Sequence, residues 1–121
     1  MARILLVEDH NDTRVTLQRL LRLDQHDVVA ADCLAAACDA IRRHDRFDVL
    51  ISDMLLPDGY GWDLLTRVDG DKKPAAAIAL TGSTGLENEQ HSLRNGFCVH
   101  LNKPVTFDAL MQAIRECLEQ N

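Results

Sequence analysis

Five short runs of apolar, β-prone residues alternate along this chain with segments of helical periodicity. The runs lie at residues 4–7, 27–31, 47–52, 76–80 and 96–101. The first run is continuously apolar, which is typical of a parallel strand covered on both faces. The alternation predicts an α/β domain: a doubly wound, five-stranded parallel sheet of order 2-1-3-4-5, with helices on both faces.

The intervening segments predict helices with identifiable starts. They lie at about 11–23, from Asp32 to about residue 43, at about 62–68, within 81–96 and after residue 106. The expected N-caps are Asn11 or Asp12, Asp32 and Thr106. Segment 81–96 offers only Leu86 and Leu93 to a core, so we expect it either to move or to be an ordinary solvated helix. In the fifth run, Phe97, Val99 and Leu101 should point one way, and Cys98 and His100 the other.

Length and charge limit the functions open to the chain. Its 121 residues carry 13 Lys and Arg against 19 Asp and Glu, a net charge of −6, which opposes nucleic-acid binding. We expect one domain over residues 1–121. The longest apolar run, 75–80, is far shorter than the roughly 20 residues that span a bilayer, so no membrane contact is expected. The acidic residues Glu8 and Asp9 come too early to leave room for the apolar stretch of a signal peptide, which favours a cytoplasmic location.

The four cysteines stand at positions 33, 38, 98 and 117 and form no CxxC pair. A chain of this length buries enough surface to fold without a disulfide or a structural metal. Zinc sites usually contain closely spaced Cys or His pairs, which are absent here. We therefore expect buried, free thiols.

Polar residues follow the predicted strands at the edge where their carboxyl ends meet. They are Glu8 and Asp9, Asp53, Thr81 and Lys103. In sheets of this order, ligands bind at that edge. Carboxylates held so close repel one another unless a cation enters. We expect Mg²⁺ on Asp9 and Asp53, with Glu8 acting through a metal-bound water.

This set of side chains favours phosphoryl transfer onto a carboxylate. Asp53 would be the nucleophile, while Lys103 and the metal offset the charge of the transferred group and Thr81 donates a hydrogen bond to it. Each residue alone has a plainer interpretation as a helix-start charge, a turn or a loop residue. Their coincidence at four strand ends favours a site.

The same residues resemble the receiver domain of two-component response regulators, over the whole chain. The matching segments are 3–12, with its acidic pair; 50–61, with the phosphoacceptor strand, Pro and Gly; 79–82, with the Thr; and 101–104, with Lys and Pro. The likeness also implies the CheY-like, flavodoxin-like fold. The closing stretch is most similar to receivers of hybrid sensor kinases, so we expect either a stand-alone receiver or a piece excised from such a kinase.

The resemblance implies that Asp53 accepts a phosphoryl group from a phosphohistidine on a sensor kinase or phosphotransfer protein. Such a domain is a switch and catalyses only its own phosphorylation and dephosphorylation. Mg²⁺ would be held by Asp9, Asp53 and the backbone carbonyl of Leu55, and the Lys103–Pro104 bond would be cis. Movement of Thr81 would repack the face made by the fourth helix, fifth strand and last helix, with homodimerisation on phosphorylation as an option.

The sequence departs from the family at switch positions. His100 stands where the family usually has Tyr or Phe, and is either a pH-sensitive group or a half-exposed strand histidine. Val105 replaces a frequent Phe. Leu55 and Ser83 occupy positions that tune the phosphoryl lifetime in the family.

Three other classes compete with this interpretation. A haloacid-dehalogenase-type hydrolase would want an Asp at position 55, where Leu stands. A flavin mononucleotide binder would need a Ser/Thr/Gly-rich loop where Glu8 and Asp9 lie. A degenerate receiver that only docks partners would not need the full set of site residues.

Overall fold

Strand β1 (Arg3–Val7) lies in the interior of the sheet, and its residues from Ile4 to Val7 are fully buried. The computed structural model describes residues 2–68, 70–82 and 96–119. The other strands of the sheet are β2 (Asp27–Ala31), β3 (Val49–Asp53), β6 (Ala76–Thr81) and β7 (Val99–Asn102). All neighbours in this sheet pair in parallel.

The strand order is β2-β1-β3-β6-β7, which confirms the predicted order 2-1-3-4-5. The labels differ because a small antiparallel hairpin, β4 (Leu55–Leu56) and β5 (Gly59–Tyr60), follows β3. The hairpin was not predicted. Each of its strands has only two residues, which is too short for a recognisable pattern.

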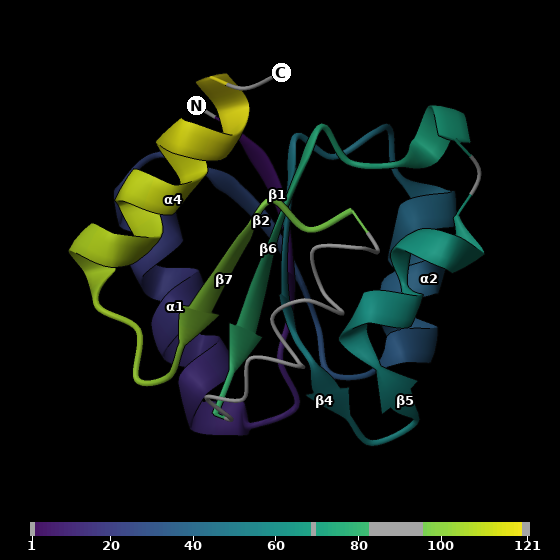
Figure 1. Cartoon of the computed structure of the whole chain (residues 1–121), viewed down its shortest axis with the longest axis horizontal. Coiled ribbons are helices and arrows are strands. Elements are labelled where there is room, and N and C mark those ends of the chain that lie inside the picture. Colours follow the sequence, from purple (N-terminus) through teal and green to yellow (C-terminus); the bar gives the residue numbers. More distant parts are fainter. Residues whose placement is uncertain (1, 69, 83–95, 120–121) are drawn as a thin grey trace.

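Helices cover both faces of the sheet (Figure 1). On one side lie α1 (Asn11–Leu23) and α4 (Phe107–Glu119), and on the other lies α2 (Leu34–Arg43). Each side has its own apolar core, since strand residues alternate between the two faces. The α1 and α4 side includes Ile4, Leu17, Leu21, Ile78, Leu110 and Ile114, and the α2 side includes Leu5, Leu34, Ile41, Phe47, Leu50 and Leu64.

Two predicted helix caps were wrong by one or two residues. His10 caps α1, and its side chain accepts the Thr13 N–H. Cys33 caps α2 through its sulfur. Both have extended backbone, whereas Asn11 is already helical, so the cap precedes it. Thr106 is confirmed as a cap, since its hydroxyl accepts the Ala109 N–H at 3.1 Å.

The predicted helix at 62–68 is replaced by two single 3₁₀ turns, Gly61–Asp63 and Leu65–Arg67. The fifth strand begins later than predicted, at Val99. Phe97 therefore precedes the strand and packs on the α2 side, while Val99 and Leu101 pack on the α1 and α4 side. The predicted common direction of these three residues was wrong, because alternation holds only within a strand.

Most of the segment expected to move, residues 83–95, lies outside the described residues. Ser83 lies there too. Within the described ranges, no helix has the length and apolarity needed to cross a membrane.

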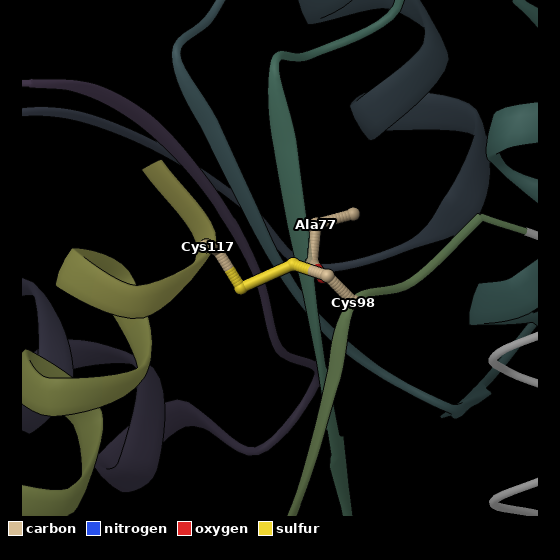
Figure 2. The surroundings of a disulfide bond; sticks show 3 residues. All are labelled: Ala77, Cys98 and Cys117. Carbon is tan, nitrogen blue, oxygen red and sulfur yellow. A yellow bond between two sulfur atoms is a disulfide. The ribbon is translucent and has the colours of Figure 1, made fainter. Parts of the chain in front are cut away.

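A disulfide joins Cys98 to Cys117 (Figure 2), so the prediction of free thiols was wrong for this pair. The sequence offers no sign of it, because 19 positions separate the two residues. Packing of α4 against β6 and β7 brings their Cα atoms to 6.2 Å, a separation that a disulfide can bridge. Cys33 and Cys38 are free, the first half-buried and the second buried.

Candidate functional site

The predicted polar residues lie at the carboxyl ends of four parallel strands, toward the bottom of Figure 1. Glu8 follows β1, Asp53 ends β3, Thr81 ends β6 and Lys103 follows β7. Glu8, Asp53 and Thr81 are buried, with exposed fractions of 0, 8 and 2%. Polar groups are rarely buried to this degree unless they have partners or a function.

Lys103 bridges two of these carboxylates. Its Nζ lies 3.0 Å from Oδ2 of Asp53 and donates a second hydrogen bond to Oε1 of Glu8. Its backbone N–H donates to the Thr81 carbonyl at 2.7 Å, which ties the loop after β7 to the end of β6. The Lys103–Pro104 peptide bond is cis, as the resemblance implied.

Burial and the hydrogen-bonded contact between Glu8 and Lys103 have opposite effects on the pKa values of these two residues. Burial raises the pKa of Glu8 to about 7, and the nearby Asp53 adds to the rise although the hydrogen bond from Lys103 opposes it. Burial alone would lower the pKa of Lys103, but its hydrogen bonds to Glu8 and Asp53 outweigh that effect and raise it. Lys103 is therefore a permanent cation in the site.

Three carboxylates can converge on one cation. Glu8, Asp9 and Asp53 each offer an oxygen, and these oxygens lie within 4.8 Å of one another. Asp9 is exposed, so an ion can reach the group from solvent. The single ammonium of Lys103 does not balance this acidic group, and ligands that are all oxygen suit Mg²⁺. The residues present therefore fit a divalent cation.

The backbone after β3 folds back toward Asp53. The Leu55 N–H donates to Oδ1 of Asp53 at 3.3 Å, while Leu55 as a residue is 59% exposed. A backbone group of Leu55 is thus next to the carboxylate, where the resemblance expects a metal ligand.

Gly61 lies against the backbone of Asp53, a contact that the sequence analysis did not single out. A Cβ at this position would lie 2.1 Å from the Asp53 carbonyl oxygen and 2.9 Å from Oγ of Ser52. The Gly61 N–H donates to the Met54 carbonyl at 2.9 Å. Only glycine fits here; the signal was the glycine that closes the matched segment 50–61.

Asp58 is a second residue that the sequence analysis missed. Its carboxylate accepts the N–H groups of Ala35 and Leu34 at 2.9 and 2.7 Å, at the start of α2. These two bonds hold the pKa of Asp58 below its ordinary value of 3.8. They tie the loop beside the site to a helix 23 and 24 positions earlier, a distance that no local pattern reveals.

His100 lies on β7, three residues before Lys103, and is half-buried. Its Nδ1 is buried and has no hydrogen-bond partner within the described part of the chain. His100 does not contact the carboxylate group through any of the hydrogen bonds or ion pairs found among these residues.

The family model described as the response regulator receiver domain matches residues 4–115. Such domains are the signalling switch domains of two-component systems, and this is the class that the fold and site define. The chain belongs to the response regulator receiver domain family.

The relatives agree with this assignment. The cell cycle response regulator CtrA of Brucella ovis is 24% identical over 119 residues, covering 98% of this chain and 51% of that protein. The chain thus spans about half the length of the curated relatives it matches. The same regulator from Brucella anthropi matches equally well. A particular similarity to hybrid-kinase receivers stays a prediction.

Solved structures with a higher sequence identity to this chain than these curated relatives have the same fold. A receiver domain protein from Clostridium thermocellum is 29% identical, with a TM-score of 0.88 and coverage of 99% of this chain and 96% of that one. A CheY-like receiver from Methanospirillum hungatei JF-1 is 28% identical, with a TM-score of 0.89 and coverage of 99% and 95%.

Proposed function

We propose that the chain is a phosphoacceptor switch in which Asp53 receives a phosphoryl group in a Mg²⁺-dependent reaction. The observation that carries the proposal is the contact between Lys103 Nζ and Asp53 Oδ2, at 3.0 Å, beside a second and a third carboxylate. A nucleophilic carboxylate, a fixed cation and a cluster of oxygen ligands are what phosphoryl transfer to Asp requires.

In the reaction, an oxygen of Asp53 attacks phosphorus while the bond from phosphorus to the donor breaks. With a phosphohistidine donor, the P–N bond breaks and the imidazole nitrogen takes up a proton. The product is an acyl phosphate. Water later attacks phosphorus, which returns the carboxylate and releases inorganic phosphate.

Each neighbour has a separate task. Lys103 offsets the negative charge of the phosphoryl oxygens, and the Thr81 hydroxyl donates a hydrogen bond to one of them. Asp9, Asp53 and the Leu55 carbonyl would hold Mg²⁺, with Glu8 acting through a water. When bound, the ion would neutralise charge and orient the donor phosphate.

The switch and its partners belong to the same proposal. Thr81 would move toward the phosphoryl group, and His100 on β7 would respond to that movement. The donor would be a sensor kinase or a phosphotransfer protein, and the transition would remodel the face that includes β7 and α4, with homodimerisation as one output. We take residues 1–121 as one receiver domain; its cytoplasmic location stays a prediction of the sequence.

Incubation with acetyl phosphate and Mg²⁺, followed by intact-mass analysis, tests the proposal. We expect one phosphoryl adduct on the native chain. Asp53→Asn or an excess of EDTA should abolish it. An adduct of equal yield on Asp53→Asn, or one that is independent of metal, would contradict the proposal.

A further inference from the structure

The Cys98–Cys117 disulfide is a covalent link between α4 and the segment that leads into β7. Cys98 immediately precedes β7, and Cys117 lies near the end of α4 (Figure 2). Cys117 is fully buried among apolar residues, whereas Cys98 is half-buried. A soluble thiol or disulfide can therefore approach the bond from the Cys98 side only.

The surroundings of Cys98 also suit a free thiol. Its sulfur lies 3.2 Å from the carbonyl oxygen of Ala77 on β6, which Figure 2 shows beside it. The same carbonyl accepts the Cys98 N–H at 2.8 Å, and a carbonyl oxygen has two lone pairs for two donors. In the reduced chain the Cys98 S–H would have an acceptor in place.

Cys117 is equally compatible with both states. It belongs to the apolar core on the α1 and α4 side, together with Leu110, Ala113 and Ile114 of its own helix. A buried thiol behaves there as a small apolar group. The surroundings of both sulfurs are therefore compatible with free thiols as well as with the disulfide.

The disulfide closes a covalent ring from Cys98 to Cys117. The ring contains β7, the loop with Lys103, and most of α4. The ring therefore includes Lys103, whose ammonium contacts Glu8 and Asp53.

We propose that Cys98 and Cys117 form a reversible thiol–disulfide site whose oxidised form clamps α4 to the start of β7. The co-reactant is a low-molecular-weight disulfide such as oxidised glutathione. Cys98 attacks it, forming a mixed disulfide and releasing one thiol; Cys117 then attacks the Cys98 sulfur and releases the second. Two protein thiols are oxidised and one external disulfide is reduced, with each leaving sulfur taking up a proton.

In a reducing cytoplasm, a disulfide is usually catalytic or redox-sensing and is not permanent. This site is independent of Asp53, so its test can be run on the Asp53→Asn variant as well as on the native chain.

Equilibration of the native chain in glutathione buffers of varied ratio tests reversibility, with acid quenching, unfolding and alkylation of the free thiols. We expect four alkyl groups in reduced buffer and two, on Cys33 and Cys38, in oxidised buffer, with a single transition between them. Four groups in every buffer would overturn the proposal, and so would a pair that stays closed even in excess reduced glutathione.

Cysteine variants show which residues give rise to the transition in thiol alkylation. The Cys33→Ser/Cys38→Ser variant should still show this transition, whereas Cys98→Ala and Cys117→Ala should not. Reduction should lower the thermal midpoint of the native chain and of the Cys33→Ser/Cys38→Ser variant by about 10 °C, because the ring no longer restricts the unfolded chain. An unchanged thermal midpoint on reduction of the native chain would overturn the proposal that the disulfide stabilises the attachment of α4 to the start of β7.

Discussion

Nζ of Lys103 lies 3.0 Å from Oδ2 of Asp53, although fifty positions separate the two residues in the sequence. The same ammonium contacts Glu8, so one cation that follows β7 forms ion pairs with carboxylates at the ends of β1 and β3. The parallel sheet makes this convergence possible, because it aligns the carboxyl ends of all its strands. A cation is thus already fixed where an anionic phosphoryl group would bind.

Replacing Lys103 by Met should slow phosphorylation of Asp53 by about 10²-fold or more, because a fixed positive charge is lost from the transition state. The initial rate of adduct formation with acetyl phosphate measures the effect. Lys73→Met, at an exposed lysine, is the matched control and should leave the rate unchanged. Equal rates for Lys103→Met and the native chain would show that the ammonium takes no part.

Replacing Gly61 by Ala should lower the free energy of unfolding by about 1–3 kcal/mol. The added Cβ would meet the Asp53 carbonyl oxygen at 2.1 Å, so the backbone of the acceptor residue must shift. Gly70→Ala is the control, since nothing lies within 4 Å of its Cβ, and it should stay within about 0.5 kcal/mol of the native value. Urea unfolding followed by far-ultraviolet circular dichroism distinguishes the two; equal stability would refute the steric argument.

Asp58→Asn should destabilise the chain at neutral pH and have less effect in acid. The folded-state pKa of Asp58 lies below its ordinary 3.8, because two N–H groups at the start of α2 stabilise the charged form. Its contribution is therefore complete above that ordinary value and is lost as the pH falls through the folded-state pKa. Urea midpoints of the two proteins should converge on acidification.

The control for this pH effect is Asp71→Asn, which makes the same charge change at an exposed position. It should show no comparable convergence. A constant difference between Asp58→Asn and the native chain at all pH values would mean that the charge of Asp58 does not contribute.

Asp9→Asn should weaken Mg²⁺ binding by at least about 10-fold, because one of three convergent carboxylates loses its charge. Trp62 offers a fluorescence signal for the titration. It is half-buried, follows Gly61 and stacks on Tyr60 with ring centroids 4.5 Å apart. Asp12→Asn, in the first turn of α1, should bind Mg²⁺ like the native chain; similar weakening by both variants would indicate only a general charge effect.

The sheet and the main site residues could be predicted because both depend on local patterns. Continuous apolar runs identify buried parallel strands, and the polar residue after each run then lies at a shared edge. Lys103 contacts Glu8 and Asp53 there, and Thr81 lies at the end of the neighbouring strand β6. Their exact roles in phosphoryl transfer are still proposals.

The remaining features depend on contacts between distant segments. Asp58 reaches α2, and Cys98 reaches Cys117, only because packing brings those elements together. The caps at His10 and Cys33 were missed for a different reason. Their nitrogen and sulfur acceptors are uncommon in a position that usually carries Ser, Thr, Asp or Asn.

The most direct test of the central claim is to locate the phosphoryl group. An acyl phosphate formed with acetyl phosphate and Mg²⁺ can be trapped by borohydride reduction, which converts the modified Asp to homoserine, and then mapped by peptide sequencing in a mass spectrometer. Our account predicts homoserine at position 53 alone, and only when Mg²⁺ was present. Modification at Asp9 or another carboxylate, with Asp53 intact, would contradict it.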